Sequence, residues 1–207
     1  MKTPKERAPQ TPISHTANGP NPDGNSLPPN YPRELSEIFT LKDGSILKIR
    51  PIHPDDMERL QYASTYCPPE TLFRRFNTPM DELSDEYSHF LTHVDYQNHL
   101  ALVAIDPAAD MIIAVARYFV PAHEELGEVA VIVGDPYPGQ GLASTLLKSL
   151  LNAAKSRGIK GFEAYIPLDN DPAGGLARCV AEKTDFVLHS EIDSGTRHLW
   201  LKFDETS

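Results

Sequence analysis

The hydrophobic and polar positions of this chain change their spacing several times after Leu41, and this spacing predicts short strands and amphipathic helices. Alternating or continuous apolar runs are typical of strands, whereas apolar residues at every third or fourth position are typical of helices. The predicted strands cover residues 46–51, 99–105, 111–120, 127–133, 161–167, 186–192 and 198–203. The predicted helices cover residues 54–64, 68–76, 84–94, 142–158 and 172–183. This order predicts an α/β (α+β) fold with a mostly antiparallel sheet and one strand–loop–helix–strand crossover.

Two segments carry the clearest patterns. The helix predicted over residues 142–158 ends at Gly158 and has a broad apolar stripe, as expected for a helix that packs on a core. The stripe consists of Leu142, Leu146, Leu147, Leu150, Leu151 and Ala154. The run 127–133 is largely apolar on both faces, which predicts a strand in the centre of the sheet.

Residues 1–36 differ from the rest of the chain because they hold eight of its 19 prolines and few large apolar side chains. A segment of this composition cannot bury enough apolar surface to offset the entropy that ordering removes. We therefore predict a disordered Pro-rich tail over residues 1–36 and one folded domain over residues 37–207. The hydrophobic content of 40% is sufficient for a core in that domain.

The chain carries 29 acidic and 19 basic residues, which gives a formal net charge of −10. Nucleic acids and anionic membranes attract surfaces rich in Lys and Arg, so the charge argues against both as partners. An acidic surface suits an amine or a lysine-bearing protein. No signal peptide or spanning apolar run is visible, and Cys67 and Cys179 lack metal-type spacing. These features predict a soluble, cytoplasmic protein.

Glycines and prolines cluster in the segment DPYPGQGLASTLL, between a predicted strand and a predicted helix. A helix that begins at Leu142 directs free backbone N–H groups and the positive end of its dipole into this loop, which favours a bound phosphate. Gly139 and Gly141 allow a close approach and an unusual φ, while Ser144 and Thr145 add hydroxyl donors. The spacing matches neither the P-loop nor the Rossmann glycine pattern.

The segment YPGQGLASTLL resembles the acetyl-CoA loop of the GNAT family of N-acetyltransferases. The family pattern is Gln/Arg-x-x-Gly-x-Gly/Ala. Gly141 and Ala143 fit its last two conserved positions, whereas Pro138 replaces the polar first residue and has no amide hydrogen. From about residue 41 to residue 203 the chain also looks like the acetyltransferase module of bacterial protein lysine acetyltransferases. The resemblance implies the GNAT fold, in which helices flank both faces of a mixed, mostly antiparallel central sheet.

The resemblance also implies roles for particular residues. Acetyl-CoA is the co-substrate, no metal is needed, and the acceptor is an amine, preferably a protein lysine. Glu128 is similar to the glutamate that serves as general base in the protein-acetylating members. The residues implied to bind the cofactor are Val131, Ile132 and Val133 through backbone groups, Gly139, Gln140, Gly141, Leu142, Ala143, Ser144 and Thr145 in the loop, and Asn170 before the last helix.

Plainer interpretations of these residues stay open. Glu128 also fits a solvent-exposed strand edge or an ion pair with Arg117 across a hairpin, and Asn170 also fits a turn or a helix N-cap. Asp95 and Tyr96 fit either the acceptor cleft or a turn.

Three further residues could take part in acid catalysis or metal binding, but we assign none of them a role. Tyr165 could protonate the leaving thiolate, but core packing is the simpler interpretation. His89 and His93 have helical i, i+4 spacing without a persuasive third ligand, so no metal site is predicted. A small-molecule amine acetyltransferase and a non-catalytic acyl-CoA sensor remain alternative functions, and Pro138 fits the sensor. The sequence does not predict an oligomeric state.

Overall fold

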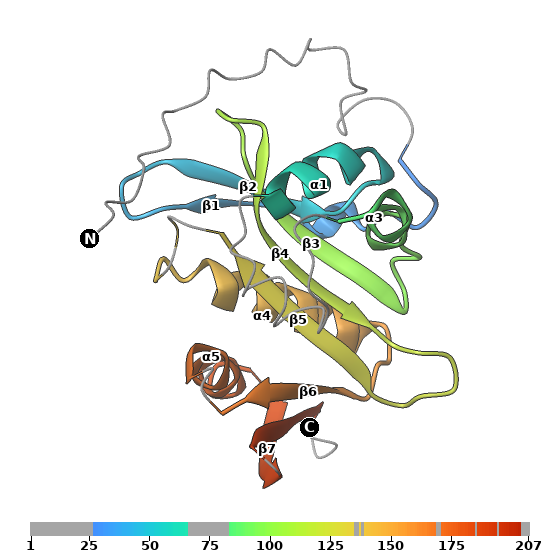
Figure 1. Cartoon of the computed structure of the whole chain (residues 1–207), viewed down its shortest axis with the longest axis vertical. Helices are drawn as coiled ribbons and strands as arrows, with labels where there is room; N and C mark the ends of the chain where they lie inside the picture. Colours follow the sequence, from blue (N-terminus) through green and yellow to red (C-terminus); the bar gives the residue numbers. More distant parts are fainter. Residues whose placement is uncertain are drawn as a thin grey trace, which may run out of the picture.

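The structure is a computed structural model that describes residues 27–65, 83–134, 137, 139–168, 171–184, 186–193 and 195–203. Its eight strands form one sheet in the order β1-β2-β3-β4-β5-β6-β8-β7 (Figure 1). The strands are β1 (Glu37–Thr40), β2 (Ile46–Pro51), β3 (His99–Asp106), β4 (Met111–Phe119), β5 (Gly127–Val133), β6 (Gly161–Pro167), β7 (Phe186–Asp193) and β8 (Thr196–Phe203). The helices are η1 (Arg33–Leu35), η2 (Pro54–Asp56), α1 (Met57–Thr65), α3 (Asp85–Thr92), α4 (Leu142–Ser156) and α5 (Asp171–Ala181). Neighbouring strands are antiparallel except β5 and β6, which confirms the predicted fold class.

Helices cover both faces of the sheet, as the resemblance implies (Figure 1). Alternate residues of a strand point to opposite faces, so each face has its own apolar cluster. α4 and α5 share one cluster with strand residues such as Tyr118 and Phe162. α1 and α3 contribute Leu60 and Leu91 to the cluster on the other face, over β3 and β4.

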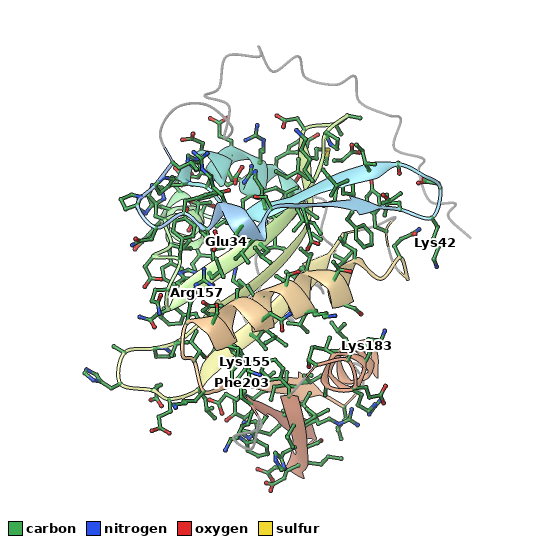
Figure 2. All side chains as sticks on the ribbon, turned by 180° about the vertical axis from the view of Figure 1, so that it is seen from behind. Glu34, Lys42, Lys155, Arg157, Lys183 and Phe203 are labelled. Carbon is green, nitrogen blue, oxygen red and sulfur yellow. The ribbon has the colours of Figure 1, made fainter. Side chains whose placement is uncertain are left out.

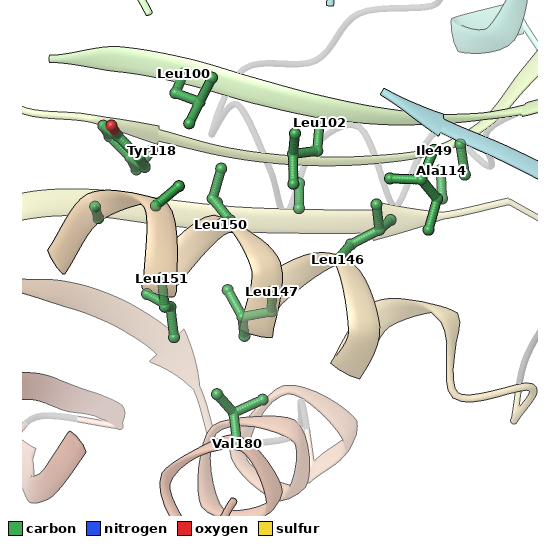
Figure 3. Close-up of a cluster of buried hydrophobic side chains, with 14 of the residues drawn as sticks. Ile49, Leu100, Leu102, Ala114, Tyr118, Leu146, Leu147, Leu150, Leu151 and Val180 are labelled. Atoms are coloured by element: carbon green, nitrogen blue, oxygen red, sulfur yellow. The ribbon is translucent and has the colours of Figure 1, made fainter. Parts of the chain in front are cut away.

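α4 is the central helix of the core. Its residues Leu146, Leu147, Leu150 and Leu151 are buried and lie between the sheet and α5 (Figure 3). Removing each such side chain from water stabilises the fold by about 1.5–3 kcal/mol. The predicted stripe is confirmed, and Gly158 follows the helix with a φ of +77°, a backbone conformation that glycine adopts without a Cβ clash.

The sheet splits between β5 and β6. In the described part of the chain these parallel strands pair only at Gly127↔Phe162 and Glu128↔Glu163, and the remaining residues of β5 have β4 as their one neighbouring strand. Residues 129–133 are therefore half-buried. The predicted strand and its central position in the sheet are confirmed, although the split leaves these residues only half-buried.

The N-terminal boundary of the fold also differs from the prediction. Residues 27–36, which the composition assigned to the tail, include η1 and lie against the domain. The Tyr31 hydroxyl donates to the Pro51 carbonyl (2.8 Å), and the Tyr31 ring meets Tyr96 edge to face with 5.3 Å between centroids. One aromatic side chain thus anchors a segment that its prolines identified as unstructured. Residues 1–26 lie outside the described residues.

Other predicted elements are confirmed. Residues 107–110 join β3 and β4 in a hairpin, and β7 pairs with β8. Ser84 caps α3, because its hydroxyl accepts the Tyr87 N–H (3.2 Å). The helix predicted over residues 68–76 lies outside the described residues. None of the helices within the described ranges combines the length and the apolar character that crossing a bilayer requires.

Candidate active site

The glycine loop leads into α4 with two left-handed residues. Gly139 has a φ of +70° and Gly141, the N-cap, has a φ of +85°. Among the described residues, no side chain caps this helix and its first turn contains no acid. The first-turn N–H groups are therefore available to an anion, and the helix dipole favours one there. Leu142 is buried and anchors the first turn in the core, while Ser144 and Thr145 are half-buried beside it.

Lys42 reaches this loop from the turn between β1 and β2, as Figure 2 shows. Its ammonium donates to the Gly139 carbonyl (2.9 Å), and its backbone N–H donates to Oε1 of Gln140 (3.2 Å). The turn is held by Asp43, whose carboxylate accepts both the N–H and the hydroxyl of Ser45 (2.9 and 2.6 Å), and these hydrogen bonds lower the pKa of Asp43. A cation therefore lies beside the predicted phosphate loop, contributed by a residue about 100 positions earlier in the chain.

The open edge of β5 presents backbone groups of alternate residues. The Gly134 N–H donates to the Ile113 carbonyl (2.8 Å), and the register between β4 and β5 continues from there without a shift. In antiparallel pairs, every second residue directs its N–H and C=O to the partner strand. Ile132 therefore faces β4, whereas Val131 and Val133 direct their N–H groups toward the split. The Ile132 N–H thus points away from the split, which leaves the N–H groups of Val131 and Val133 as the two candidate oxyanion donors.

Glu128 is exposed at the second residue of β5, where the split begins. It lies opposite Phe119 of β4 and beside Glu163 of β6, on the face opposite α4. Arg117, the ion-pair partner considered from the sequence, lies opposite Ala130 instead. Its buried guanidinium donates to the Leu91 carbonyl and contacts Nε2 of His99. Glu128 thus has the exposure that a base acting on an incoming substrate needs.

The turn interpretation accounts for Asp95 and Tyr96. One carboxylate oxygen of Asp95 accepts the N–H groups of residues 97, 98 and 99 at 2.7 to 2.9 Å. The Tyr96 hydroxyl donates to the Ile52 carbonyl (3.0 Å), and burial raises the pKa of this tyrosine. Both side chains are engaged in holding the backbone before β3, so neither is assigned to the acceptor.

The structure contradicts the interpretation of Tyr165 and shows how His89 and His93 lie. Tyr165 is 64% exposed, so the core interpretation is wrong, and its ring stacks on His198. The His89 and His93 rings stack at 3.6 Å, and the described residues contain no group of three or more His, Cys, Asp or Glu placed to hold a metal ion. Asn170 and Pro138 lie outside the described residues.

Sequence reasoning missed Lys42 and Glu163. For Glu163, its alternation with Phe162 and Ala164 could have indicated the polar face of β6.

Comparisons with known proteins agree with this geometry. The family model for the acetyltransferase (GNAT) domain matches residues 47–187. Acetyltransferase Pat of Mycolicibacterium smegmatis is 33% identical over 131 residues, which are 63% of this chain and 39% of that protein. Acetyltransferase PA5475 of Pseudomonas aeruginosa is 30% identical over 125 residues, which are 59% of this chain and 67% of that protein. The chain thus spans less than half the length of the Mycolicibacterium relative.

Solved structures show the same fold. The GNAT domain of S. lividans PAT superposes with a TM-score of 0.73 at 28% identity, covering 84% of this chain and 99% of that domain. The cAMP-binding acyltransferase from Mycobacterium smegmatis has a TM-score of 0.52 at 25% identity, covering 82% of this chain and 48% of that protein. The family match covers more than half of the 207 residues, and the split sheet and glycine loop accompany it. The chain belongs to the GNAT family of acetyl-CoA-dependent N-acetyltransferases.

Proposed function

We propose that this protein transfers the acetyl group of acetyl-CoA to lysine side chains of proteins, with Glu128 as the general base. The observation that carries the proposal is the split between β5 and β6, which leaves one edge of β5 open between the α4 N-terminus and Glu128. The net charge of −10 and the resemblance to protein lysine acetyltransferases support a cationic acceptor. The location in the cytoplasm stays a prediction.

The cofactor is held by backbone groups at two places in this proposal. The N–H groups from Gly139 to Ser144 and the Thr145 hydroxyl bind the pyrophosphate, where the α4 dipole and Lys42 add positive potential. The pantetheine amides pair with the open edge of β5, as a peptide adds a strand to a sheet edge. Asn170 stays a predicted contact of coenzyme A. Both main contacts use main-chain groups. Pro138 lacks both a polar side chain and an amide hydrogen, so we expect it to lower the affinity for acetyl-CoA without changing which cofactor is bound.

Glu128 and the open edge of β5 have different roles in the proposed reaction: Glu128 accepts a proton, and the backbone of the edge stabilises negative charge. A lysine ammonium has a pKa near 10.4, and only the neutral amine attacks a thioester, so Glu128 accepts the proton. As the nitrogen forms its bond to the carbonyl carbon, one of the two outward N–H groups, that of Val131 or that of Val133, stabilises the oxyanion, and the other is left to pair with pantetheine. The C–S bond then breaks. The coenzyme A thiol has a solution pKa near 8.5, so its thiolate leaves without a dedicated acid.

The test is an incubation of the protein with radiolabelled acetyl-CoA, a cell lysate and a panel of polyamines. We expect label on lysines of proteins, located by mass spectrometry, and release of free thiol that depends on the acceptor. Label confined to small molecules would replace the acceptor class with small amines. Calorimetric binding of acetyl-CoA without transfer to any acceptor would favour a sensor.

Lys42 gives a first quantitative prediction. Replacing Lys42 by Ala removes a cation and the hydrogen bond to the Gly139 carbonyl, so we expect the Kd of coenzyme A to rise roughly fivefold, about 1 kcal/mol. Because the contact is exposed, the difference from wild type should shrink at high salt. Lys48→Ala, which removes an exposed lysine on β2 of the same hairpin, is the control. Equal affinities of both variants, measured by calorimetry, would exclude Lys42 from the cofactor site.

A further inference from the structure

A row of polar and aromatic side chains crosses the sheet on the face opposite α4 and α5. Residues that are direct neighbours in register point to the same face of a sheet. In order across six strands, the row consists of His99, Phe119, Glu128, Glu163, Trp200 and His189. Adjacent strands lie about 4.8 Å apart, so Glu163 is the immediate neighbour of the proposed base.

Glu163 is held in place by a fixed imidazole. Nε2 of His198 lies 3.0 Å from Oε2 of Glu163, and the two side chains are 20% and 32% exposed. The His198 ring stacks on that of Tyr165, with 4.0 Å between centroids, and its centroid lies 3.7 Å from that of the Trp200 ring. Two aromatic rings therefore contact the imidazole. An Nε2–H donor uses one lone pair of the carboxylate, and Glu163 keeps further acceptor sites for a ligand.

The charge of this face favours a bound cation. α3 reaches the border of this face through Phe90, whose ring lies 5.9 Å from that of Phe119. Beyond that border no described helix packs on this face of β6 or β8, since α5 packs on the opposite face. Glu191 and Asp193 of β7 extend the row of carboxylates and are exposed. On the same face of the described strands β5 to β8, Lys202 is the basic residue. On these described strands, carboxylates therefore outnumber the lysine and arginine side chains of this face.

We propose that this face is the acceptor site and that Glu163 pairs with the ammonium group of the incoming lysine. The inference rests on the proposed function, because it identifies the site of the acceptor for that reaction. An ammonium group has three donors, so it can bond Glu163 and Glu128 together, and the exposed ring of Tyr165 and the half-exposed ring of Trp200 attract the cation. Glu128 takes the proton, and Glu163 positions the amine. The occupant is a lysine in a segment with basic flanking residues, which the carboxylates of β7 favour.

Steady-state kinetics of the full chain separate the two glutamates. For a lysine peptide with basic flanks, Glu163→Gln should raise the KM of the peptide about tenfold while kcat changes less than about threefold and the KM of acetyl-CoA stays constant. His198→Ala should raise the peptide KM about fivefold, and His198→Gln should recover part of the loss, because its amide donates from nearly the same place. Glu182→Gln, at an exposed position that directly follows α5, is the control.

The outcomes decide the inference in each case. An unchanged peptide KM in Glu163→Gln, or a loss confined to kcat, overturns it. A wild-type protein without activity on peptides contradicts the proposed function instead, and binding then decides the inference. Calorimetry of the coenzyme A complex should detect the lysine peptide with wild type, at least fivefold weaker binding with Glu163→Gln, and no binding of the acetyl-lysine peptide. Equal binding of all three combinations overturns the inference independently of turnover.

Discussion

Replacement of Glu128 by Gln should lower turnover at least tenfold, and on the order of 100-fold, while the Kd of acetyl-CoA remains that of wild type. The amide keeps the size of the side chain and cannot accept the proton. Glu128 is exposed and lies on the face opposite the glycine loop's helix, so cofactor binding does not depend on it. Initial rates with a lysine peptide and calorimetry with coenzyme A measure the two quantities.

The pH dependence distinguishes a base from a binding residue. The deficit of Glu128→Gln should shrink as the pH rises from 7 toward the amine pKa near 10.4, since the acceptor then loses its proton to solvent. Glu125→Gln changes an exposed carboxylate three residues earlier and should behave as wild type at each pH. Near-wild-type turnover of Glu128→Gln at pH 7 would remove Glu128 from the mechanism.

The second large effect is expected for Asp56→Ala, which should lower the free energy of unfolding by about 3–5 kcal/mol. Asp56 is fully buried and accepts both guanidinium nitrogens of Arg50 at 2.7 Å together with the His53 N–H at 2.8 Å. Without this carboxylate, Arg50 remains as a buried charge that lacks its counterion. Chemical denaturation followed by circular dichroism measures the loss.

Asp110→Asn is the control for this change. Asp110 and Asp56 both pair with Arg59, but the Asp110 side chain is 68% exposed. An exposed ion pair contributes about 0–1 kcal/mol, and Asn tolerates the left-handed φ of +53° at this position, so Asp110→Asn should be nearly neutral. A cost below 1 kcal/mol for Asp56→Ala would contradict the assigned role of burial.

Local patterns predicted the parts of the fold that depend on neighbours in sequence. The stripe of α4 is a repeat of one helical turn, and Gly141 and Gly158 mark its ends through positive φ values. β1 was missed because its four residues are mostly exposed at the edge of the sheet and carry little apolar periodicity. Tyr31 was missed because one residue hardly alters the average composition of a proline-rich segment.

The sequence predicted the backbone elements of the candidate site, the loop and the strand before it, better than the positions of its side chains. The loop and the strand before it follow from residues 127–145, which are contiguous. The contact of Lys42 with Gly139 joins positions 97 residues apart, and no local pattern encodes it. Tyr165 appeared to belong to the core because aromatic residues in strands usually do, yet register assigns it to the uncovered face.

The brief pairing of β5 with β6 has a mechanical consequence. Among the described residues, β5 and β6 pair at two positions, and core side chains such as Tyr118 and Phe162 pack across the seam, so we expect this seam to open at a lower free energy than the continuously paired strands β3 and β4. A molecule wedged into the seam and bonded to β5 would stiffen it. Amide hydrogen exchange along β6 should therefore report on occupancy more sensitively than exchange in the β3–β4 hairpin, where pairing is continuous.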